Sequence, residues 1–408
     1  MNNKSELKIL VLDDERFMLK LLAYMLANQG YTHVTTCDSG QAALDHMDQQ
    51  LSPPDIILLD LNMPEMDGIE FLRHLVHRHY AGGIILVSGE GERMQQSAEK
   101  LVRAHQIKIL GHLQKPASPT KLAAMLENFS KRKPGAAREA AKTYSAEEVR
   151  AAITQGELVN YYQPKVLVTT GRVTGVETLV RWQHPRDGLV MPNQFIQVAE
   201  SHGLIDKLTR HVISQALEQA SAWQKAGLPL RVAINVSMSN LASLDFADFV
   251  ATTTAAAGVS ARNITLEVTE SRLMEDPCAP LETITRLHLK RFRLSIDDFG
   301  TGHSTLAQLR DIPFDELKID QSFVHGASDN KTIRAMFDAS LGLARKLEIE
   351  AVAEGIEDRA DWDFLRTTDC DLAQGYFIAR PMPAADLAAW ISTWEAGLAD
   401  LMVAPDHS

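Results

Sequence analysis

Five polar side chains in the first 125 residues could together carry phosphoryl chemistry. Asp13 and Asp14 follow the first apolar run, Asp60 ends the third, Ser88 ends the fourth and Lys115 closes the fifth. In a parallel sheet such positions meet at one edge, where three carboxylates repel one another and a hard cation such as Mg²⁺ relieves the repulsion. An acceptor aspartate then becomes a nucleophile, Lys115 neutralises the transferred phosphoryl group, and the Ser88 hydroxyl follows that group inward.

A second and larger set of polar side chains falls at the ends of successive apolar runs later in the chain. One such residue is ordinary, but a carboxylate on strand after strand indicates that they share one mouth of a barrel. The absence of histidine and cysteine from this set favours Mg²⁺ or Mn²⁺ over zinc. The set comprises Glu177, Asn235, Glu267, Asp297, Asp298, Lys318, Asp320, Glu354 and Gln374.

The consecutive acids Asp297 and Asp298 indicate what this second site would do. A bridging carboxylate and its neighbour can hold two cations about 3.5–4 Å apart, the spacing used for in-line attack on phosphate esters. Lys318 and Asp320 alternate on one strand and so face the same way, which would place a lysine beside the cations to orient the attacking water. The pattern therefore predicts phosphodiester chemistry.

The first acids are positioned by an alternation of short β-branched runs and helical stretches. Strands are expected at residues 7–12, 34–37, 55–59, 83–87 and 107–113. Such βα units predict an α/β fold with a doubly wound, flavodoxin-like parallel sheet. The alternation of strands and helices ends near Ser130, where a basic stretch interrupted by Pro-Gly begins. We expect a domain over residues 1–130, a linker over 131–147, and a new helix after a capping box of Ser145 and Glu148.

Eight further strands, mostly separated by long helical patterns, position the second set. They are expected at residues 159–168, 172–182, 231–236, 264–269, 293–296, 316–319, 348–353 and 373–378. Eight strands over about 250 residues predict a modified TIM (β/α)₈ barrel over residues 148–400. The turn at Thr169-Thr170-Gly171 predicts that the first two strands form an antiparallel hairpin.

The first set of motifs comprises Asp13-Asp14, Asp60 with Met63-Pro64-Glu65-Met66-Asp67-Gly68, Ser88 and Lys115-Pro116. Over about the first 125 residues it resembles the receiver domain of two-component response regulators. The resemblance implies that Asp60 is the phosphoacceptor, and that Asp13 or Asp14 and the Asn62 carbonyl help to hold Mg²⁺. His112 stands where the family usually has an aromatic switch residue, which implies unorthodox signal transmission. A scaffold that is never phosphorylated and serves for dimerisation or docking is the alternative.

The second series of motifs resembles the EAL-domain cyclic di-GMP phosphodiesterases over about residues 148–396. It comprises Glu177-Thr178-Leu179, Asn235-Val236-Ser237, Glu267-Val268-Thr269-Glu270, Asp297-Asp298-Phe299-Gly300-Thr301-Gly302, Leu317-Lys318-Ile319-Asp320, Ala353-Glu354-Gly355 and Gln374-Gly375-Tyr376. The resemblance implies a modified TIM barrel that hydrolyses cyclic di-GMP to linear pGpG.

That resemblance also implies a role for each matching residue. One cation would be held by Glu177, Asn235, Glu267 and Asp297, and the second by Asp297, Asp298 and either Asp320 or Glu354. Lys318 with Glu354 would manage the nucleophilic water. The remaining carried-over residues are Gln163 and Arg181 as substrate contacts, Glu270 as the anchor of the loop after Asp298, and Gln374 as a site-lining amide.

Two positions depart from the family pattern. Thr178 replaces the alanine of Glu-Ala-Leu, but on a strand it points away from the face of Glu177, so we expect little harm. His303-Ser304-Thr305 replaces Tyr-Ser-Ser in a loop that the family uses for metal binding and dimer contact. This second change implies activity that is lowered or regulated differently.

Composition bounds the partners. Acidic residues exceed basic ones by 12 in 408 residues, so the surface repels a phosphate backbone and we expect no DNA binding. Three widely spaced cysteines fit reduced thiols, and no apolar run reaches the length of a membrane span, so we expect a cytoplasmic protein without membrane insertion.

We therefore expect a response regulator with an enzymatic output. A histidine kinase or phosphotransfer protein would phosphorylate Asp60, and the receiver would regulate the cyclic di-GMP phosphodiesterase through a homo-oligomeric interface. The alternatives are a receptor that binds cyclic di-GMP without cutting it and an inert scaffold; both are disfavoured because no metal ligand and no lysine of the set is missing.

Overall fold

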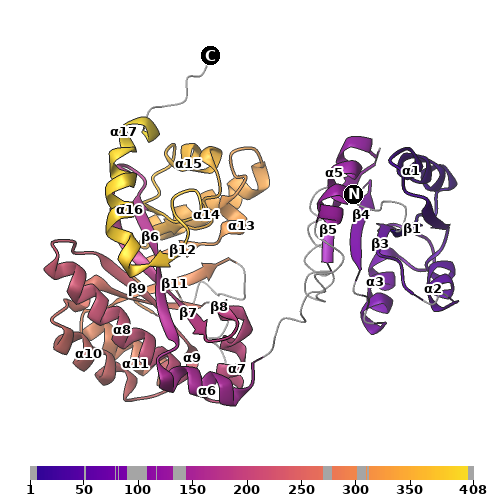
Figure 1. Cartoon of the computed structure of the whole chain (residues 1–408). Coiled ribbons are helices and arrows are strands. Elements are labelled where there is room, and N and C mark those ends of the chain that lie inside the picture. Colours follow the sequence, from indigo (N-terminus) through magenta and orange to yellow (C-terminus); the bar gives the residue numbers. More distant parts are fainter. Residues whose placement is uncertain are drawn as a thin grey trace. The chain divides into compact units, whose positions relative to one another are not determined.

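The structure is a computed structural model that describes residues 7–49, 52–78, 80, 82–89, 108–115, 117–131, 144–269, 278–300, 309 and 312–402. It divides into two compact units, Met1–Ala140 and Ala141–Ser408, each with its own core (Figure 1). Among the described residues, no helix combines the length and the apolar character needed to cross a bilayer.

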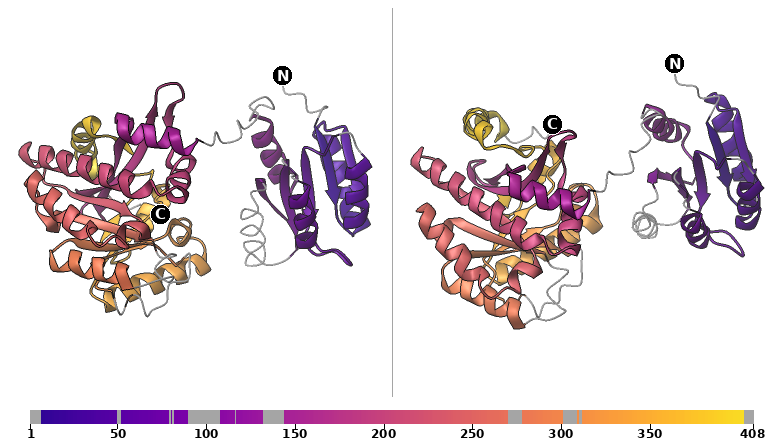
Figure 2. Two further views of the ribbon diagram at one scale, coloured as in Figure 1. Left: turned by 90° about the horizontal axis from the view of Figure 1, so that it is seen from below. Right: turned by 60° about the horizontal axis from the view of Figure 1, so that its bottom comes forward.

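The first unit is a parallel sheet in the order β2-β1-β3-β4-β5, which confirms the predicted doubly wound fold. All its strand pairs are parallel, and β3 is buried from end to end because helices cover both faces of the sheet (Figure 2). Its elements are β1 Lys8–Leu12, α1 Arg16–Asn28, β2 His33–Cys37, α2 Gly40–Gln49, β3 Ile56–Asp60, α3 Gly68–His77, β4 Gly83–Ser88, β5 Lys108–Gln114 and α5 Pro119–Lys131.

Alternation along the strands produces two cores, one on each face of this sheet. On β3, Ile57 and Leu59 pack with α2 and α3, whereas Ile56 and Leu58 pack with α1 and α5. The strands end together at one edge, so Asp60 at the end of β3 and Ser88 at the end of β4 become neighbours of the turn after β1.

The second unit is a closed ring of eight strands in the order β6-β14-β13-β12-β11-β10-β9-β7, with β7 returning to β6. Short strands β8 and β15 extend it. Its elements are α6 Ala146–Gln155, β6 Leu158–Leu167, β7 Val173–His184, β8 Gly188–Val190, η1 Pro192–Gln194, α7 Ile196–Ser201, α8 Ile205–Lys225, β9 Arg231–Val236, α9 Met238–Leu241, α10 Phe246–Ala257, η2 Ala261–Asn263, β10 Ile264–Thr269, α11 Cys278–Leu289, β11 Arg293–Phe299, β12 Glu316–Ile319, α13 Gln321–Val324, α14 Lys331–Lys346, β13 Glu350–Ala353, α15 Arg359–Leu365, β14 Leu372–Ala373, β15 Met382–Pro383, α16 Ala384–Ala396 and α17 Leu398–Leu401.

The start of the barrel is irregular, as the hairpin turn predicted. Strand β6 pairs antiparallel with β7 and also antiparallel with β14, so it closes the ring against the direction of the other strands. Helix α6 precedes it and begins at Ala146, where Ser145 and Glu148 form the predicted capping box. Tyr144 packs on Trp182 of β7 with ring centroids 4.5 Å apart, which ties the start of this unit to the barrel.

One predicted strand is wrong. The run over residues 373–378 forms only Leu372–Ala373 and then turns, because the chain passes closely over the segment after β13. A Cβ on Gly375 would lie 2.2 Å from the backbone nitrogen of Ile356, and the Phe377 amide donates to the Ile356 carbonyl at 2.9 Å. The ladder therefore ends at Gln374, which is left at the mouth of the barrel.

The interior of the barrel is polar, whereas the outward faces of its strands are apolar. On β10, Leu266 and Val268 belong to the core beneath the helices, and Glu267 between them points inward. The same alternation on β12 sends Leu317 outward and Lys318 inward. The alternation of side chains along each strand thus places these charged residues inside the barrel.

Candidate active site

A single lysine lies among four carboxylates inside the barrel. Lys318 Nζ is 2.7 Å from Glu354 Oε1, 2.8 Å from Asp297 Oδ1, 3.4 Å from Glu267 Oε2 and 3.6 Å from Glu177 Oε2. The four acids come from β7, β10, β11 and the residue after β13. The structure therefore brings together five of the residues that the sequence predicted as catalytic or metal-binding, Glu177, Glu267, Asp297, Lys318 and Glu354.

Amide side chains orient Glu177 from both sides. Asn235 Nδ2 donates to Glu177 Oε1 at 2.9 Å, and Gln374 Nε2 donates to Glu177 Oε2 at 2.6 Å. Gln374 Nε2 also lies 3.1 Å from Gln163 Oε1, and Gln163 Nε2 donates to the Ala379 carbonyl at 3.0 Å. The predicted substrate contact Gln163 and the site-lining amide Gln374 thus belong to one network with a metal-ligand candidate.

Asp297 and Asp298 reach the same site because β11 carries a bulge. The register with β12 shifts between Ile296 and Phe299, so that β11 has one extra residue at this point. Asp298 adopts φ +55°, a left-handed conformation that non-glycine residues seldom take outside strained functional sites. Oxygens of Asp297, Asp298 and Glu354 consequently lie within 4.8 Å of one another.

The site holds more negative charge than its lysines neutralise. Burial, and then the neighbouring Glu177, raise the pKa of Glu267 to about 8. Burial likewise raises the pKa of Glu354 to about 7 and, together with Asp297, that of Asp298 to about 6. Burial also opposes the ionisation of Glu177, but Lys318, Lys165 and the two amides outweigh it and lower its pKa. A cluster of oxygen ligands in need of positive charge fits hard divalent cations.

A second acid cluster lies at the edge of the parallel sheet in the first unit. Oxygens of Asp13, Asp14 and Asp60 lie within 4.8 Å of one another, and Lys115 Nζ is 2.7 Å from Asp60 Oδ2 and 3.0 Å from Asp13 Oδ2. Burial raises the pKa of Asp13 despite its bonds to Lys115. Ser88 is buried at the end of the neighbouring strand. This arrangement also fits a hard cation beside a nucleophilic carboxylate.

Family models match two stretches of the chain, the response regulator receiver domain at residues 9–127 and the EAL domain at residues 146–381. The cyclic di-GMP phosphodiesterase RocR of Pseudomonas aeruginosa is 32% identical over 381 residues, which cover 93% of this chain and 97% of RocR. The chain belongs to the EAL-domain family. It carries a receiver domain before the EAL domain, and the alignment with RocR extends over both domains.

Two further similarities concern the EAL domain alone. The bifunctional diguanylate cyclase/cyclic di-GMP phosphodiesterase MucR of the same species is 37% identical over 60% of this chain and 36% of MucR, so the chain spans about a third of that protein. A solved structure of the PaMucR phosphodiesterase in a c-di-GMP complex is 38% identical with a TM-score of 0.56, covering 59% of this chain and 98% of that chain.

Two predicted residues of the EAL domain, Asp320 and Arg181, have their printed contacts outside the lysine cluster. Asp320 uses Oδ1 to cap α13, accepting from the Ser322 amide at 2.9 Å and the Ser322 hydroxyl at 2.5 Å. Arg181 donates to the Val180 carbonyl at 2.9 Å, and its guanidinium lies 5.7 Å from the centre of the Tyr161 ring. Glu270 and the loop His303-Ser304-Thr305 lie outside the described residues.

Two buried charged residues of the EAL domain were missed from the sequence. Lys165 Nζ lies 2.7 Å from Glu267 Oε1 and 3.0 Å from Glu316 Oε1. The alternation along each strand does predict that they face inward, because Lys165 lies two residues after Gln163 and Glu316 lies two residues before Lys318. A search for polar residues at strand ends does not find them, because both lie deeper in the barrel than those neighbours.

In the receiver domain, His112 lies half-buried on β5, at the position noted for its departure from the family pattern. The Asn62 amide donates to Asp60 Oδ1 at 3.2 Å, which places the residue whose carbonyl was expected to bind Mg²⁺ beside the phosphoacceptor candidate. Pro116 lies outside the described residues.

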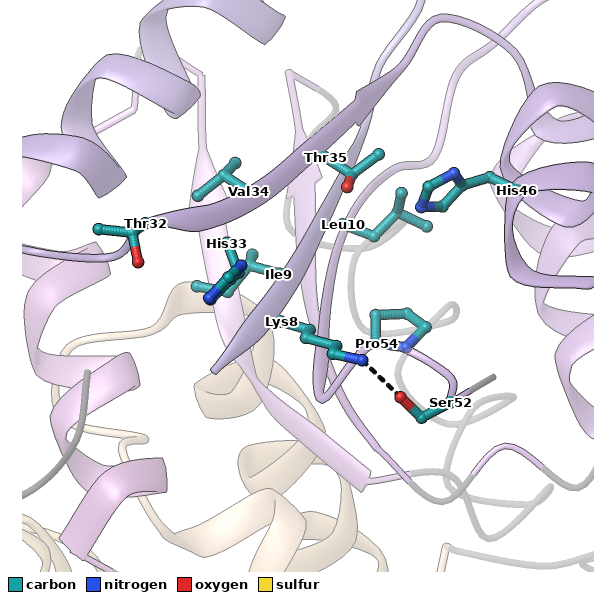
Figure 3. A pocket seen from close by; sticks show the side chains of 10 residues that line it. All are labelled: Lys8, Ile9, Leu10, Thr32, His33, Val34, Thr35, His46, Ser52 and Pro54. Carbon is teal, nitrogen blue, oxygen red and sulfur yellow. Dashed lines mark hydrogen bonds between the residues drawn. The ribbon is translucent and has the colours of Figure 1, made fainter. Parts of the chain in front are cut away.

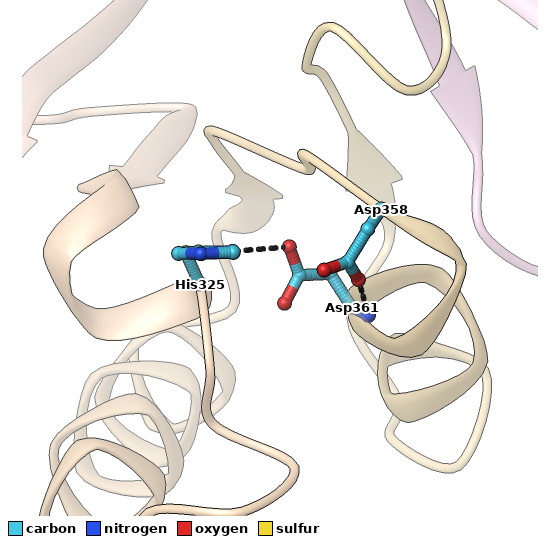
Figure 4. Close-up of side chains that lie close together, drawn as sticks. All are labelled: His325, Asp358 and Asp361. Carbon is cyan, nitrogen blue, oxygen red and sulfur yellow. Dashed lines mark hydrogen bonds and ion pairs between the residues drawn. The ribbon is translucent and has the colours of Figure 1, made fainter. Parts of the chain in front are cut away.

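A histidine and two aspartates of the EAL domain also lie close together (Figure 4). His325 Nδ1 is 2.8 Å from Asp361 Oδ2, which accepts the Glu357 amide at 3.0 Å, while Asp361 Oδ1 accepts the Gly326 amide at 3.1 Å. Asp358 accepts the Asp361 amide as the cap of α15. Because these oxygens already have N–H donors, the cluster ties two loops together and offers little to a cation.

A cavity of about 270 Å³ in the receiver domain lies along β2 and the amino-terminal half of β1 (Figure 3). Lys8 borders it and bonds the Ser52 hydroxyl at 2.5 Å. None of its ten lining residues is a carboxylate, and Lys8 stands at the opposite end of β1 from Asp13. The cavity is therefore separate from the acid cluster.

Proposed function

We propose that the chain is a two-component response regulator whose barrel hydrolyses cyclic di-GMP to linear pGpG at a rate set by phosphorylation of Asp60. The observation that carries the proposal is the Lys318 ammonium among four carboxylates from four separate strands. RocR and MucR, whose names include cyclic di-GMP phosphodiesterase, support the substrate class. The receiver would extend over residues 1–130, the linker over 131–147 and the barrel over 148–400.

Two divalent cations, Mg²⁺ or Mn²⁺, would supply positive charge at the phosphate and a water that ionises near neutral pH. The residues proposed to hold the first are Glu177, Asn235, Glu267 and Asp297, and those for the second are Asp297, Asp298 and either Asp320 or Glu354. The Asn235 amide nitrogen is engaged by Glu177, which leaves the amide oxygen as the donor atom for a cation.

The proposed reaction adds the oxygen of water to phosphorus and breaks one P–O ester bond of the ring, and the leaving ribose oxygen takes up a proton to become the free hydroxyl of pGpG. Lys318 holds and orients the water, and Glu354, which lies 2.7 Å from its ammonium, accepts the proton. A pKa of about 7 suits Glu354 to this task at neutral pH. Gln163, Arg181 and Gln374 would bind the substrate and keep its phosphate at the metals.

Asp60 would take the phosphoryl group from a histidine kinase or a phosphotransfer protein, with Mg²⁺ held by Asp13 and Asp14. Lys115, 2.7 Å from Asp60, would neutralise the new charge. Ser88 and His112 lie on the two strands that end beside the acceptor and would report its state. We propose that the signal reaches the barrel through a homo-oligomeric contact.

The full chain incubated with cyclic di-GMP and Mg²⁺ tests the enzymatic role. Chromatography of the nucleotides should show pGpG, which disappears when EDTA is added. Cyclic di-GMP that stays bound and intact under the same conditions would instead establish the receptor alternative. Repeating the assay with acetyl phosphate gives the sign of regulation by the receiver.

A further inference from the structure

A second layer of charge lies beneath Lys318 inside the barrel. Lys165 Nζ is 2.7 Å from Glu267 Oε1 and 3.0 Å from Glu316 Oε1, and the Ser295 hydroxyl donates to the same Glu316 oxygen at 3.0 Å. All four side chains are buried. Charges therefore alternate from Glu316 through Lys165 and Glu267 to Lys318.

The strand register explains why these residues meet. Glu267 pairs in register with Ser295 on β11, and Ser295 pairs with Glu316 on β12, so the three lie at one level of the ring. Lys165 crosses from β6, where alternation places it on the inward face two residues from Gln163. Its ammonium bonds two carboxylates of this level, Glu267 and Glu316.

Glu267 belongs to both layers through its two oxygens. Lys165 occupies Oε1 at hydrogen-bond distance, whereas Oε2 accepts no hydrogen bond from the described residues and faces Lys318 Nζ at 3.4 Å. A carboxylate with one oxygen fixed in this way cannot turn about its terminal bond without breaking the contact with Lys165. Only Oε2 remains to act as a ligand.

We infer that Lys165, which Glu316 holds in turn, is a positioning residue that fixes the Glu267 carboxyl group so that it presents Oε2 alone to a divalent cation. This inference rests on the proposed function, because that function supplies the cation. Groups that hydrogen-bond to metal ligands orient them, and removing such groups commonly weakens metal binding by about 10- to 100-fold.

Stability alone does not explain the pair. A buried ion pair is often neutral in stability against well-packed apolar side chains, since both ions lose their hydration. Simple charge balance is the rival explanation, and it makes the opposite prediction. Without the Lys165 charge the site becomes more negative, so charge balance predicts tighter binding of a cation, whereas loss of positioning predicts weaker binding.

Two variants of the full chain separate these explanations when Mn²⁺ binding is measured by electron paramagnetic resonance without nucleotide. Every sample, the wild-type reference included, carries Asp13→Asn and Asp14→Asn, which remove the cation site proposed in the receiver. Lys165→Met/Glu316→Gln removes both charges and leaves the net charge unchanged, so charge balance predicts unaltered affinity. Lys165→Met alone removes one positive charge. The inference predicts Mn²⁺ affinity at least about tenfold weaker than wild type in each variant that keeps a cooperative thermal transition.

A matched control removes a different ion pair of the same barrel. Arg231 Nη1, on β9, lies 2.6 Å from Glu350 Oε2, on β13, and Arg293 Nη2 lies 2.7 Å from the same oxygen. This group has no hydrogen bond or ion pair with Glu267 among the described residues, so Arg231→Met/Glu350→Gln should bind Mn²⁺ like wild type even if it unfolds earlier. Unchanged Mn²⁺ affinity in folded Lys165→Met/Glu316→Gln, or tighter Mn²⁺ binding in folded Lys165→Met, would overturn this inference and leave the proposed function standing. Wild-type protein that binds no Mn²⁺ would contradict the inference and the proposed function together.

Discussion

The ammonium of Lys318 lies 2.7 Å from a carboxylate oxygen of Glu354, inside a barrel whose outward strand faces pack against apolar side chains. Burial opposes a charged lysine here, but the surrounding carboxylates, Glu177 first among them, raise the Lys318 pKa well above its usual range. A lysine that stays charged can orient water and stabilise charge on phosphate, but it cannot serve as a base. This contact supports the proposal that Glu354 is the base and that Lys318 orients the water.

Lys318→Met should lower the rate of pGpG formation by about 100-fold or more, because the water loses its orienting charge while the ligands remain. The rate constant at saturating cyclic di-GMP and Mg²⁺ is the measurement. Lys290→Met is the matched control, since Lys290 pairs with exposed Asp248 on the helical layer, and its rate should equal that of wild type. Near-normal turnover by Lys318→Met would rule out the assigned role.

Gly375→Ala should destabilise the barrel by about 1–3 kcal/mol and lower turnover. The new Cβ would lie 2.2 Å from the Ile356 nitrogen, and the segment that must shift carries Gln374, which bonds Glu177 at 2.6 Å. Urea unfolding and steady-state rates test this. Gly342→Ala on α14 meets nothing within 4 Å and should instead stabilise by about 0.5–1 kcal/mol. A fully active, equally stable Gly375→Ala would refute the close approach.

The fate of Gly375 also shows what the sequence could and could not predict. Strand period placed nearly every strand and sent Glu177, Glu267 and Lys318 to one mouth, because inward and outward faces alternate strictly. It could not reveal the close backbone contact between Gly375 and Ile356, which depends on the tertiary fold, and so the strand predicted over residues 373–378 is too long.

The same limit applied to residues beside the predicted ones. Period 2 should send Asp297 and Asp298 to opposite faces, and only the bulge against β12 lets both reach the site. Lys165 and Glu316 carried the right alternation, but their partners become visible only in the register of the closed ring. The sequence indicates which face of a strand each side chain lies on. Which residues of different strands lie side by side depends on the strand register, which only the fold shows.

Asp60→Asn should abolish labelling of the chain by ³²P-acetyl phosphate, because the amide is no nucleophile toward phosphorus. The rate of cyclic di-GMP hydrolysis should then no longer respond to the phosphodonor. Asp45→Asn, on the exposed side of α2, is the control and should label like wild type. Label that persists in Asp60→Asn would move the acceptor to another residue.

His325→Gln should destabilise the protein more in acid than in alkali. The hydrogen bond with Asp361 raises the His325 pKa above 6.5, so the stabilisation is complete below pH 6.5 and is lost as pH rises through the folded-state pKa. The melting temperature of the variant should therefore lie below that of wild type at pH 5.5, and the difference should be smaller at pH 9. His202→Gln, whose ring bonds the Val198 carbonyl, should show no such narrowing. An equal gap for His325→Gln at both pH values would contradict the ion pair.

The most direct test of the account is a titration of free Mg²⁺ against the rate of pGpG formation from cyclic di-GMP, in wild type and in Glu177→Gln. The account predicts no reaction without metal, saturation in wild type, and a Glu177→Gln rate that stays low and needs far more Mg²⁺, since Glu177 is held as a ligand by Asn235 and Gln374. Glu218→Gln, on the exposed side of α8, should follow wild type. Hydrolysis that survives EDTA, or a wild-type metal requirement in Glu177→Gln, would contradict the carboxylate site as the centre of catalysis.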